Sequence, residues 1–551
     1  PFKETLFRLP LLTATKDGKS NSRLSKQIYS RKRLKEILDE FCRNAPSMLL
    51  FLKHIEKISV GIWMDDPNDK QQKNPNIYFT ANVESMNRQI KSLRAFVTTA
   101  EAAAKLAAST KDAEGIAQQQ AVDYKLNIRS KWIDNVDMNI HDNNDDNNEK
   151  NNSNGSTKRH GDSFSTGIEI SVLEQWMVCN QLGGGQSHFI ATHEDNLHLK
   201  LVPWAGVAAL IKREDSNGNS LLNQGNNKSN SKQQSTTTGQ VYCFLPLPVF
   251  TGLPVHINGY FELSSNRRDI WSGTDMAGDG ALRAKWNQSL LEDVVVPCYT
   301  RLLNQTAHSL GHEPYYRNLL DYYLLFPSNH PTLPIWRSMI IKFYDSIKNM
   351  TLFYSKTGNG RWINGQQQAY LPPYARGEDG NVNTNTDMDD NITSTNIKNQ
   401  LESIFIKSKI VNIIHGLPAD LCETLLHFQV IKKVLNPKMV RVLLRSNELR
   451  DFPMQLLLTN KNNMNTDNYK NNNNINNKEE NNRYKDIMFL LQFCMSDLNA
   501  NTYVEMDKIK LLPLCDGHLG AIHLRGQINV EEKLLFQLRD MGFPYQIAWS
   551  A

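Results

Sequence analysis

Cysteine is scarce in this sequence, and no two cysteines stand close enough to form a C-x-x-C pair. The seven residues are scattered singly, several of them inside apolar runs such as WMVCN and VYCFLPL: Cys42, Cys179, Cys243, Cys298, Cys422, Cys494 and Cys515. The spacing excludes a disulfide scaffold and a paired-cysteine metal site, and it is typical of reduced, buried thiols. We therefore expect a cytoplasmic protein.

A long apolar run and a strong excess of one charge are also missing. No apolar stretch approaches the length of about 18 residues that a membrane-spanning helix needs, and no signal peptide is apparent. The net charge is +5, from 62 basic and 57 acidic residues, which is too small an excess to indicate nucleic-acid binding. The chain opens on Pro1, inside a strand-like stretch, so we expect it to be a piece of a longer protein.

Aromatic residues are almost absent from four asparagine-rich segments, near 138–163, 213–239, 376–398 and 460–484. Such segments cannot bury enough apolar surface to offset about 1–2 kcal/mol of backbone entropy per residue. We expect disordered inserts on the outside of folded units. The alternative is a prion-like assembly role, which asparagine tracts favour when they are long and interleaved with aromatics.

The remaining sequence is patterned. Residues 24–43 place apolar side chains on one helical face, and residues 166–180 and 239–264 alternate as strands do. Residues 286–303 carry a helical stripe that Pro297 should kink. From about residue 316 onward the pattern is mostly helical, with short strands. The fold class is therefore α/β, followed by a mostly helical α+β region.

Three motifs that suggest catalysis each lack a required residue. Thr13 stands where a phosphate loop ending in Gly-Lys-Ser needs its first glycine, and His188 stands where the glycine run 183–185 would need the last glycine of a dinucleotide fingerprint. Leu197 replaces the second zinc histidine after His193 and Glu194. With no serine elbow or cysteine–histidine signature either, an autonomous enzyme is not supported, and we expect no metal site.

The stretch VFTGLPVHINGYFELSSNRRDIWSG, from 249 to 273, contains two adjacent arginines. Ser264, Ser265 and Asn266 are suitable N-caps, so we expect a helix beginning near Arg267. A helix N-terminus favours anions, and an arginine there can hold a phosphate through two hydrogen bonds. Arg267 and Arg268 are thus candidate phosphate-sensing residues.

The alternative for these arginines is structural. Both could pair with Asp269, Asp275 or Asp279 and only close the turn, since ion-pair networks often imitate sites. The acids and glycines of 275–280 could also bind a divalent cation, but they do not match the calcium-loop pattern, which favours a polar turn.

Several stretches resemble the repeat region of the sacsin family. They run in order along the chain: TLFRLPL (5–11), PWAGVAA (203–209), FLPLP (244–248), GLPVHINGYFELSSNRRDIWSG (252–273), WNQSLLEDVVVPCYTRLL (286–303), VRVLLRS (440–446) and LLPLCDG (511–517). The resemblance implies the tail of a GHKL-type ATP-binding domain at 1–22. A middle-domain-like α/β sandwich, similar to that of the ninety-kilodalton heat-shock chaperones, would occupy 23–310. A mostly helical C-terminal region would occupy 311–551.

The same resemblance implies roles for three residues. Thr5 would open the last strand of the nucleotide domain near the phosphates, although Glu4 stands where the family has glycine. Arg267 or Arg268 would reach the γ-phosphate from the second domain. ATP and Mg would belong to the full-length parent, a weak ATPase, and we expect this piece alone neither to bind ATP tightly nor to hydrolyse it.

The function implied is chaperone-related protein quality control in the cytoplasm. This region would couple ATP-driven domain closure to the binding of client proteins, partner proteins or other chaperones, with no nucleic acid or membrane span involved. The alternative is an inactive scaffold or interaction module that lacks nucleotide coupling.

Overall fold

The computed structural model describes residues 29–52, 54–62, 76–84, 121–133, 169–222, 239–273, 278–328, 334–367, 369–373, 388–462, 476–498, 502–513 and 519–522. The chain divides into two compact units, one drawn from residues 1–302 and 331–339 and the other from 303–330 and 340–551. The first contains a large sheet with helices, and the second is richer in helices, so the coarse α/β class is confirmed. The domain limits at 22 and 310, and the likeness to chaperone domains, stay predictions.

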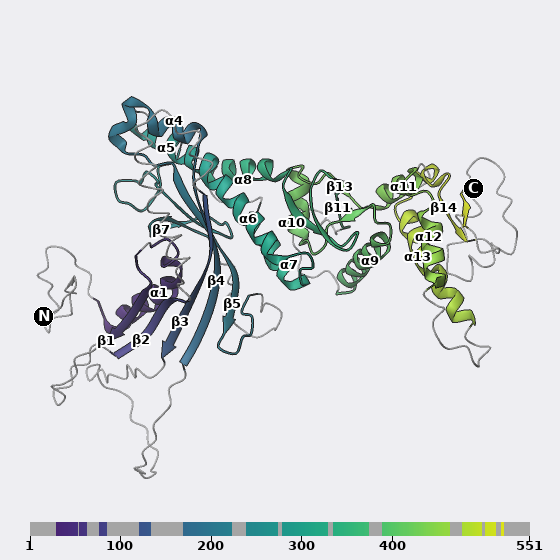
Figure 1. The fold of residues 1–551 in the computed structure, drawn as a ribbon, viewed down its shortest axis with the longest axis horizontal. Coiled ribbons are helices and arrows are strands. Elements are labelled where there is room, and N and C mark those ends of the chain that lie inside the picture. The colour runs from purple at the N-terminus through teal and green to yellow at the C-terminus, as the bar shows by residue number, and fades with distance from the viewer. Residues whose placement is uncertain are drawn as a thin grey trace, which may run out of the picture. The chain divides into compact units, whose positions relative to one another are not determined.

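An eight-stranded sheet dominates the first unit (Figure 1). Its order is β1-β2-β3-β4-β5-β8-β6-β7, and all neighbouring pairs are antiparallel except β6 and β8. The strands are β1 (Lys57–Ile62), β2 (Asn76–Glu84), β3 (Ala121–Ile133), β4 (Glu169–Leu182), β5 (Trp204–Asp215), β6 (Gln240–Cys243), β7 (Leu245–Phe250) and β8 (His256–Gly259).

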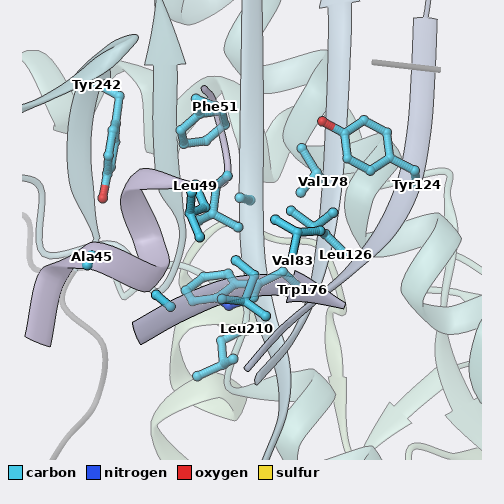
Figure 2. Packing of buried hydrophobic residues seen from close by; sticks show 14 of the residues in the cluster. Ala45, Leu49, Phe51, Val83, Tyr124, Leu126, Trp176, Val178, Leu210 and Tyr242 are labelled. Carbon is cyan, nitrogen blue, oxygen red and sulfur yellow. The ribbon is translucent and has the colours of Figure 1, made fainter. Parts of the chain in front are cut away.

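Helix α1 (Arg31–Met48) packs on β1, β2 and β3, as the apolar stripe in this part of the sequence predicts. Ser30 begins it by accepting a hydrogen bond from the Arg33 amide at 3.1 Å. Figure 2 shows Ala45 of α1 and Leu49, which directly follows α1, among side chains from the strands, including Leu126 and Trp176. The alternation along β3 places every second side chain in this core, because successive residues of a strand face opposite sides.

The helical stripe of 286–303 is interrupted next to Pro297, as predicted. Helix α5 (Asp279–Leu290) passes through the π-helical turn η2 (Leu291–Val295) into α6 (Val296–Leu310). Proline has no N–H to donate to the carbonyl four residues earlier, and the Val296 amide bonds instead to the carbonyl of Leu291, five residues back. Two short helices precede this segment, α4 (Gly185–Thr192) and the 3-10 helix η1 (Glu194–Leu199).

The rest of the chain builds short strands between helices. The strands are β9 (Thr351–Ser355), β10 (Arg361–Asn364), β11 (Ala369–Leu371), β12 (Asn412–Ile413), β13 (Lys433–Val434), β14 (Lys510–Pro513) and β15 (Leu519–Ala521). The helices are α7 (Tyr316–Tyr323), α8 (Pro334–Ile347), α9 (Met388–Ile406), α10 (Ala419–His427), α11 (Pro437–Arg445), α12 (Phe452–Asn462), α13 (Asn476–Met495) and the 3-10 helix η3 (Tyr503–Met506). Strands β11, β12 and β13 are parallel, in the order β12-β11-β13, with α9 and α10 as crossovers.

The limits predicted for the asparagine-rich inserts were too wide. Residues 388–398 belong to α9, residues 476–484 to α13, residues 460–462 to α12 and residues 213–215 to β5. A helix that is nucleated by its buried part extends into polar sequence at little cost, because each added residue gains a hydrogen bond. The central part of each insert, and all of 138–163, lie outside the described residues. In the part of the chain that is described, every helix is too short or too polar to cross a bilayer.

Burial of His256 gives a test of the sheet's pH dependence. Its Nδ1 accepts a hydrogen bond from the Gln240 amide at 3.1 Å, and its ring stacks on Trp176 and meets the edge of Tyr242. Burial lowers the pKa of His256 to about 4, from 6.5. The unfolded chain therefore binds more protons between these values, and stability that is complete above pH 6.5 is lost as the pH falls towards 4.

We expect His256 to contribute about 3 kcal/mol to the fall in unfolding free energy over this range. Urea unfolding from pH 7 to pH 4 should show a shallower pH dependence in His256→Phe than in the wild type. His198→Phe, which makes the same substitution at an exposed position, is the control. Parallel curves for wild type and His256→Phe would contradict this assignment.

Candidate functional site

Arg267 and Arg268 lie in a tight turn, and the expectation of a helix beginning there is wrong. Leu263 and Ile270 pair as an isolated antiparallel bridge, and Ser264 and Arg267 close the turn through a 2.8 Å hydrogen bond from the Arg267 amide to the Ser264 carbonyl. Arg267 has φ 55, in the left-handed region. The next helix, α5, begins only at Asp279.

The supposed N-caps explain why this segment turns. The Ser264 hydroxyl accepts a hydrogen bond from the Asp269 amide at 3.2 Å, and Asn266 Oδ1 accepts one from the Arg268 amide at 3.0 Å. Short polar side chains that bond to nearby backbone give the chain an alternative to helix. The same residue types that suggested a helix start therefore stabilise a turn, which we call the arginine turn (residues 262–271).

Both guanidinium groups are exposed at the tip of the arginine turn. Within the described residues, neither Arg267 nor Arg268 forms an ion pair or a side-chain hydrogen bond, and Asp269 and Asp279 do not neutralise them. Asp275, the third acid of the structural alternative, lies outside the described residues. The tip thus presents two adjacent positive charges to solvent.

The base of the arginine turn is held by the buried amide of Asn287 on α5. Asn287 Oδ1 accepts from the Glu262 amide at 2.8 Å, and its Nδ2 donates to the carbonyls of Glu262, at 2.8 Å, and Trp271, at 2.9 Å. One side chain therefore bonds to both ends of the turn. Because an unpaired buried amide is costly, these bonds strongly favour the observed geometry.

Two further side chains of α5 hold the same segment. Trp286 Nε1 donates to the Tyr260 carbonyl at 2.9 Å, and the Arg283 guanidinium pairs with the Glu262 carboxylate. The acid at the base of the turn, Glu262, is thus neutralised by an arginine of α5. The Glu262 carboxylate therefore pairs with Arg283 and not with Arg267 or Arg268.

The corner beside the turn is also fixed by side chains. Asn258 lies in β8, where its Oδ1 accepts a hydrogen bond from the Phe244 amide at 2.9 Å, so the Asn-Gly pair extends the strand and does not form a turn after it. Half-buried Cys243 lies nearby; burial raises the pKa of its thiol, and the charge of Arg267 opposes that shift. A raised pKa makes a reactive thiolate unfavourable.

The remaining predicted site features are Thr5, the acidic loop, metal-binding side chains and the cysteines. Thr5 and the segment 1–22 lie outside the described residues, as does most of 275–280. No cluster of three or more metal-binding side chains occurs in the described part of the chain. The six described cysteines are free and five of them are buried, as their apolar surroundings predicted.

Two buried polar groups in the second unit were not predicted. Arg441, inside the VRVLLRS stretch, is buried and bonds through Nη2 to Glu505 Oε2 at 2.7 Å and also to the Asp497 carboxylate. His415 Nδ1 lies 2.7 Å from Glu402 Oε2 just after β12, while His415 Nε2 and Glu402 Oε1 find no partner among the described atoms. Only contacts across 13 to 64 residues of sequence reveal these pairs, so no local pattern could have found them.

Comparison with known proteins supports the resemblance noted in the sequence. A family model described as Sacsin domain matches residues 1–75. Human Sacsin is 26% identical over 367 residues, a match that covers 64% of this chain and 6% of the human protein. No solved structure matches the chain. The predicted resemblance to sacsin is confirmed. Because the match covers only a small part of the human protein, the activity and partners of this chain remain proposals.

Arg441 allows a stability test of the second unit. The Arg441 side chain is buried, but Asp497 and Glu505 are partly exposed, so water can rehydrate the two carboxylates after its removal. We therefore expect Arg441→Met to lower the unfolding free energy of this unit by about 2 kcal/mol, through lost charge-assisted hydrogen bonds. Hydrogen exchange of the α11 and α13 amides measures this loss of unfolding free energy. The exposed Arg445→Met is the control, and equal protection in both variants would contradict the expectation.

Proposed function

We propose that this sacsin-like chain is the middle region of a chaperone-related protein and that its arginine turn responds to a nucleoside triphosphate. The triphosphate would be held by a GHKL-type domain that includes Thr5 and sequence before it. The observation that carries the proposal is the exposed pair, Arg267 and Arg268, on a turn whose base is rigidly bonded to α5.

The chemistry of the turn suits a phosphate more than a structural role. A structural ion pair would have its acid within the fold, yet Glu262, at the base of the turn, is paired with Arg283. A guanidinium presents a planar set of donors that matches phosphate oxygens, and its charge is most useful where charge develops on a transferred phosphoryl group. Since the backbone of the turn is held before any ligand arrives, the freedom lost on contact would be that of the side chains alone.

ATP with Mg would supply the reacting phosphate in the parent, and this chain would supply the sensing arginine. Arginine on one domain that contacts phosphate on another makes domain closure depend on the nucleotide. We infer that closure changes the binding of client proteins or partner chaperones in cytoplasmic protein quality control. The alternative, an inactive scaffold, predicts no dependence on the two arginines.

The first test uses the parent protein with its preceding domain in place. Arg267→Ala and Arg268→Ala are compared with wild type for ATP turnover, and the exposed Lys285→Ala on α5 is the control for loss of a positive charge nearby. We expect one of the two arginine variants to reduce kcat by about tenfold or more, because a transition-state arginine is worth at least that much. Unchanged kcat in both, and in the double variant, would favour the scaffold.

The second test uses the chain alone. We expect calorimetric titration with MgATP to show no micromolar binding, because an exposed arginine pair without the rest of a nucleotide site offers only weak, screened attraction. Inorganic triphosphate and ATP should therefore give the same weak, salt-dependent signal. Micromolar affinity for ATP, or preference for ATP over triphosphate, would contradict the assignment of the nucleotide to the preceding domain.

A further inference from the structure

The glycine run that failed as a dinucleotide motif has a different role in the structure. Gly183, which directly follows β4, is buried against η2, and a Cβ on it would lie 2.1 Å from Val294 Cγ2. A Cβ on Gly185, which has φ +62, would lie 3.1 Å from the Asp293 carboxylate. Gly184 between them faces open space. Two of the three glycines are therefore needed for close approach to the π-helical turn.

Asp293 bonds η2 to the start of α4. Its Oδ2 accepts a hydrogen bond from the Ser187 amide at 2.8 Å, in the first turn of α4. A carboxylate in this position satisfies an otherwise unpaired amide and interacts favourably with the helix dipole. Helices α4 and α5 contact each other beside one end of the sheet (Figure 1). The turn η2 thus fixes where α4 begins.

The helix that contains η2 also holds the arginine turn, through a residue four positions before η2. Asn287 precedes Leu291, the first residue of η2, by four positions, and it bonds both ends of the arginine turn. Leu291, Val294 and Val295 are fully buried, and η2 packs on β4, β5 and α4. A π-helical turn contains one residue more per turn than an α-helix, so a change at η2 rotates α5 relative to α6.

We propose that Gly183, Asp293 and Val294 are positioning residues that set the orientation of α5 and, through Asn287, of the arginine turn. Contact between the turn and a phosphate would then be transmitted to the glycine loop and α4. The role of phosphate contact in this transmission rests on the proposed function. The mechanical link between η2 and the arginine turn does not, so it can be tested in the chain alone without nucleotide.

The test compares two adjacent glycine variants by hydrogen exchange. Gly183→Ala places a methyl group against Val294, whereas Gly184→Ala adds one to open space and is the matched control. We expect the amides of Ser264, Arg267 and Trp271, which are hydrogen-bonded in the turn, to exchange at least about fivefold faster in Gly183→Ala, and at the wild-type rate in Gly184→Ala. Asn287→Ala, which removes the bonds at the base of the turn, is the positive control.

A rescue separates positioning from general destabilisation. Val294→Ala removes Cγ2, the atom closest to the added methyl group, so the double variant Gly183→Ala with Val294→Ala should restore most of the protection in the arginine turn. A merely structural effect would raise exchange throughout β3, β4 and β5 in proportion to lost global stability. Equal turn protection in the two glycine variants, or a loss spread uniformly over the unit, would overturn the proposal.

A second variant keeps the proposal testable if Gly183→Ala does not fold. Asp293→Asn keeps the shape of the side chain but weakens its bond to the Ser187 amide, and it should also speed exchange in the arginine turn; Asp279→Asn on the same segment is its control. ATP turnover of the parent is then measured separately. If the η2 variants leave exchange in the arginine turn unchanged but ATP turnover still depends on the arginines, only this inference is wrong. If the η2 variants change exchange in the turn but ATP turnover does not depend on the arginines, only the proposed function is wrong.

Discussion

The buried amide of Asn287 is the interaction on which the candidate site depends. It accepts from one end of the arginine turn and donates to both ends, at distances of 2.8 to 2.9 Å. No other type of side chain of similar size offers both an acceptor and two donors in this geometry. Because α5 is itself anchored by Trp286 and by the buried residues of η2, the exposed arginines are supported by the core of the sheet. The backbone that carries the two exposed arginine side chains is thereby held in place.

The two units satisfy their buried polar groups in different ways. In the first, His256 is neutral among Trp176 and Tyr242, and burial holds its pKa low. In the second, Arg441 keeps its charge because Asp497 and Glu505 surround it, and hydrogen bonds from Arg441 lower the pKa of Glu505. The Glu402–His415 pair is satisfied on one side only, with a free nitrogen and a free oxygen among the described atoms. Such polar contacts restrict each unit to one arrangement of its helices.

Much of the fold followed from local pattern. The α1 stripe, the strand character of β4 and of β6 to β8, and the break beside Pro297 were all predicted, because periodicity reports which face is buried and proline lacks a donor. Strand β3 was missed although it alternates clearly, since an alanine- and glutamine-rich stretch precedes it and an asparagine-rich insert follows it. The inserts were drawn too wide because composition describes a window of residues, whereas a helix end is set by the elements packed against its other end.

The sequence by itself determined which residues are available: a serine, an asparagine and two arginines together, a run of three glycines, and a helix with one proline. It also carried the resemblance to the sacsin family, because that resides in the order of residues. Only the tertiary structure decided that Ser264 and Asn266 form a turn and not a helix cap, and that Arg283 pairs with Glu262 at the base of that turn. It alone brought Gly183 against Val294, which is 111 positions along the chain. The physical reason is that the competing local conformations differ by about 1 kcal/mol, so contacts between distant segments select among them.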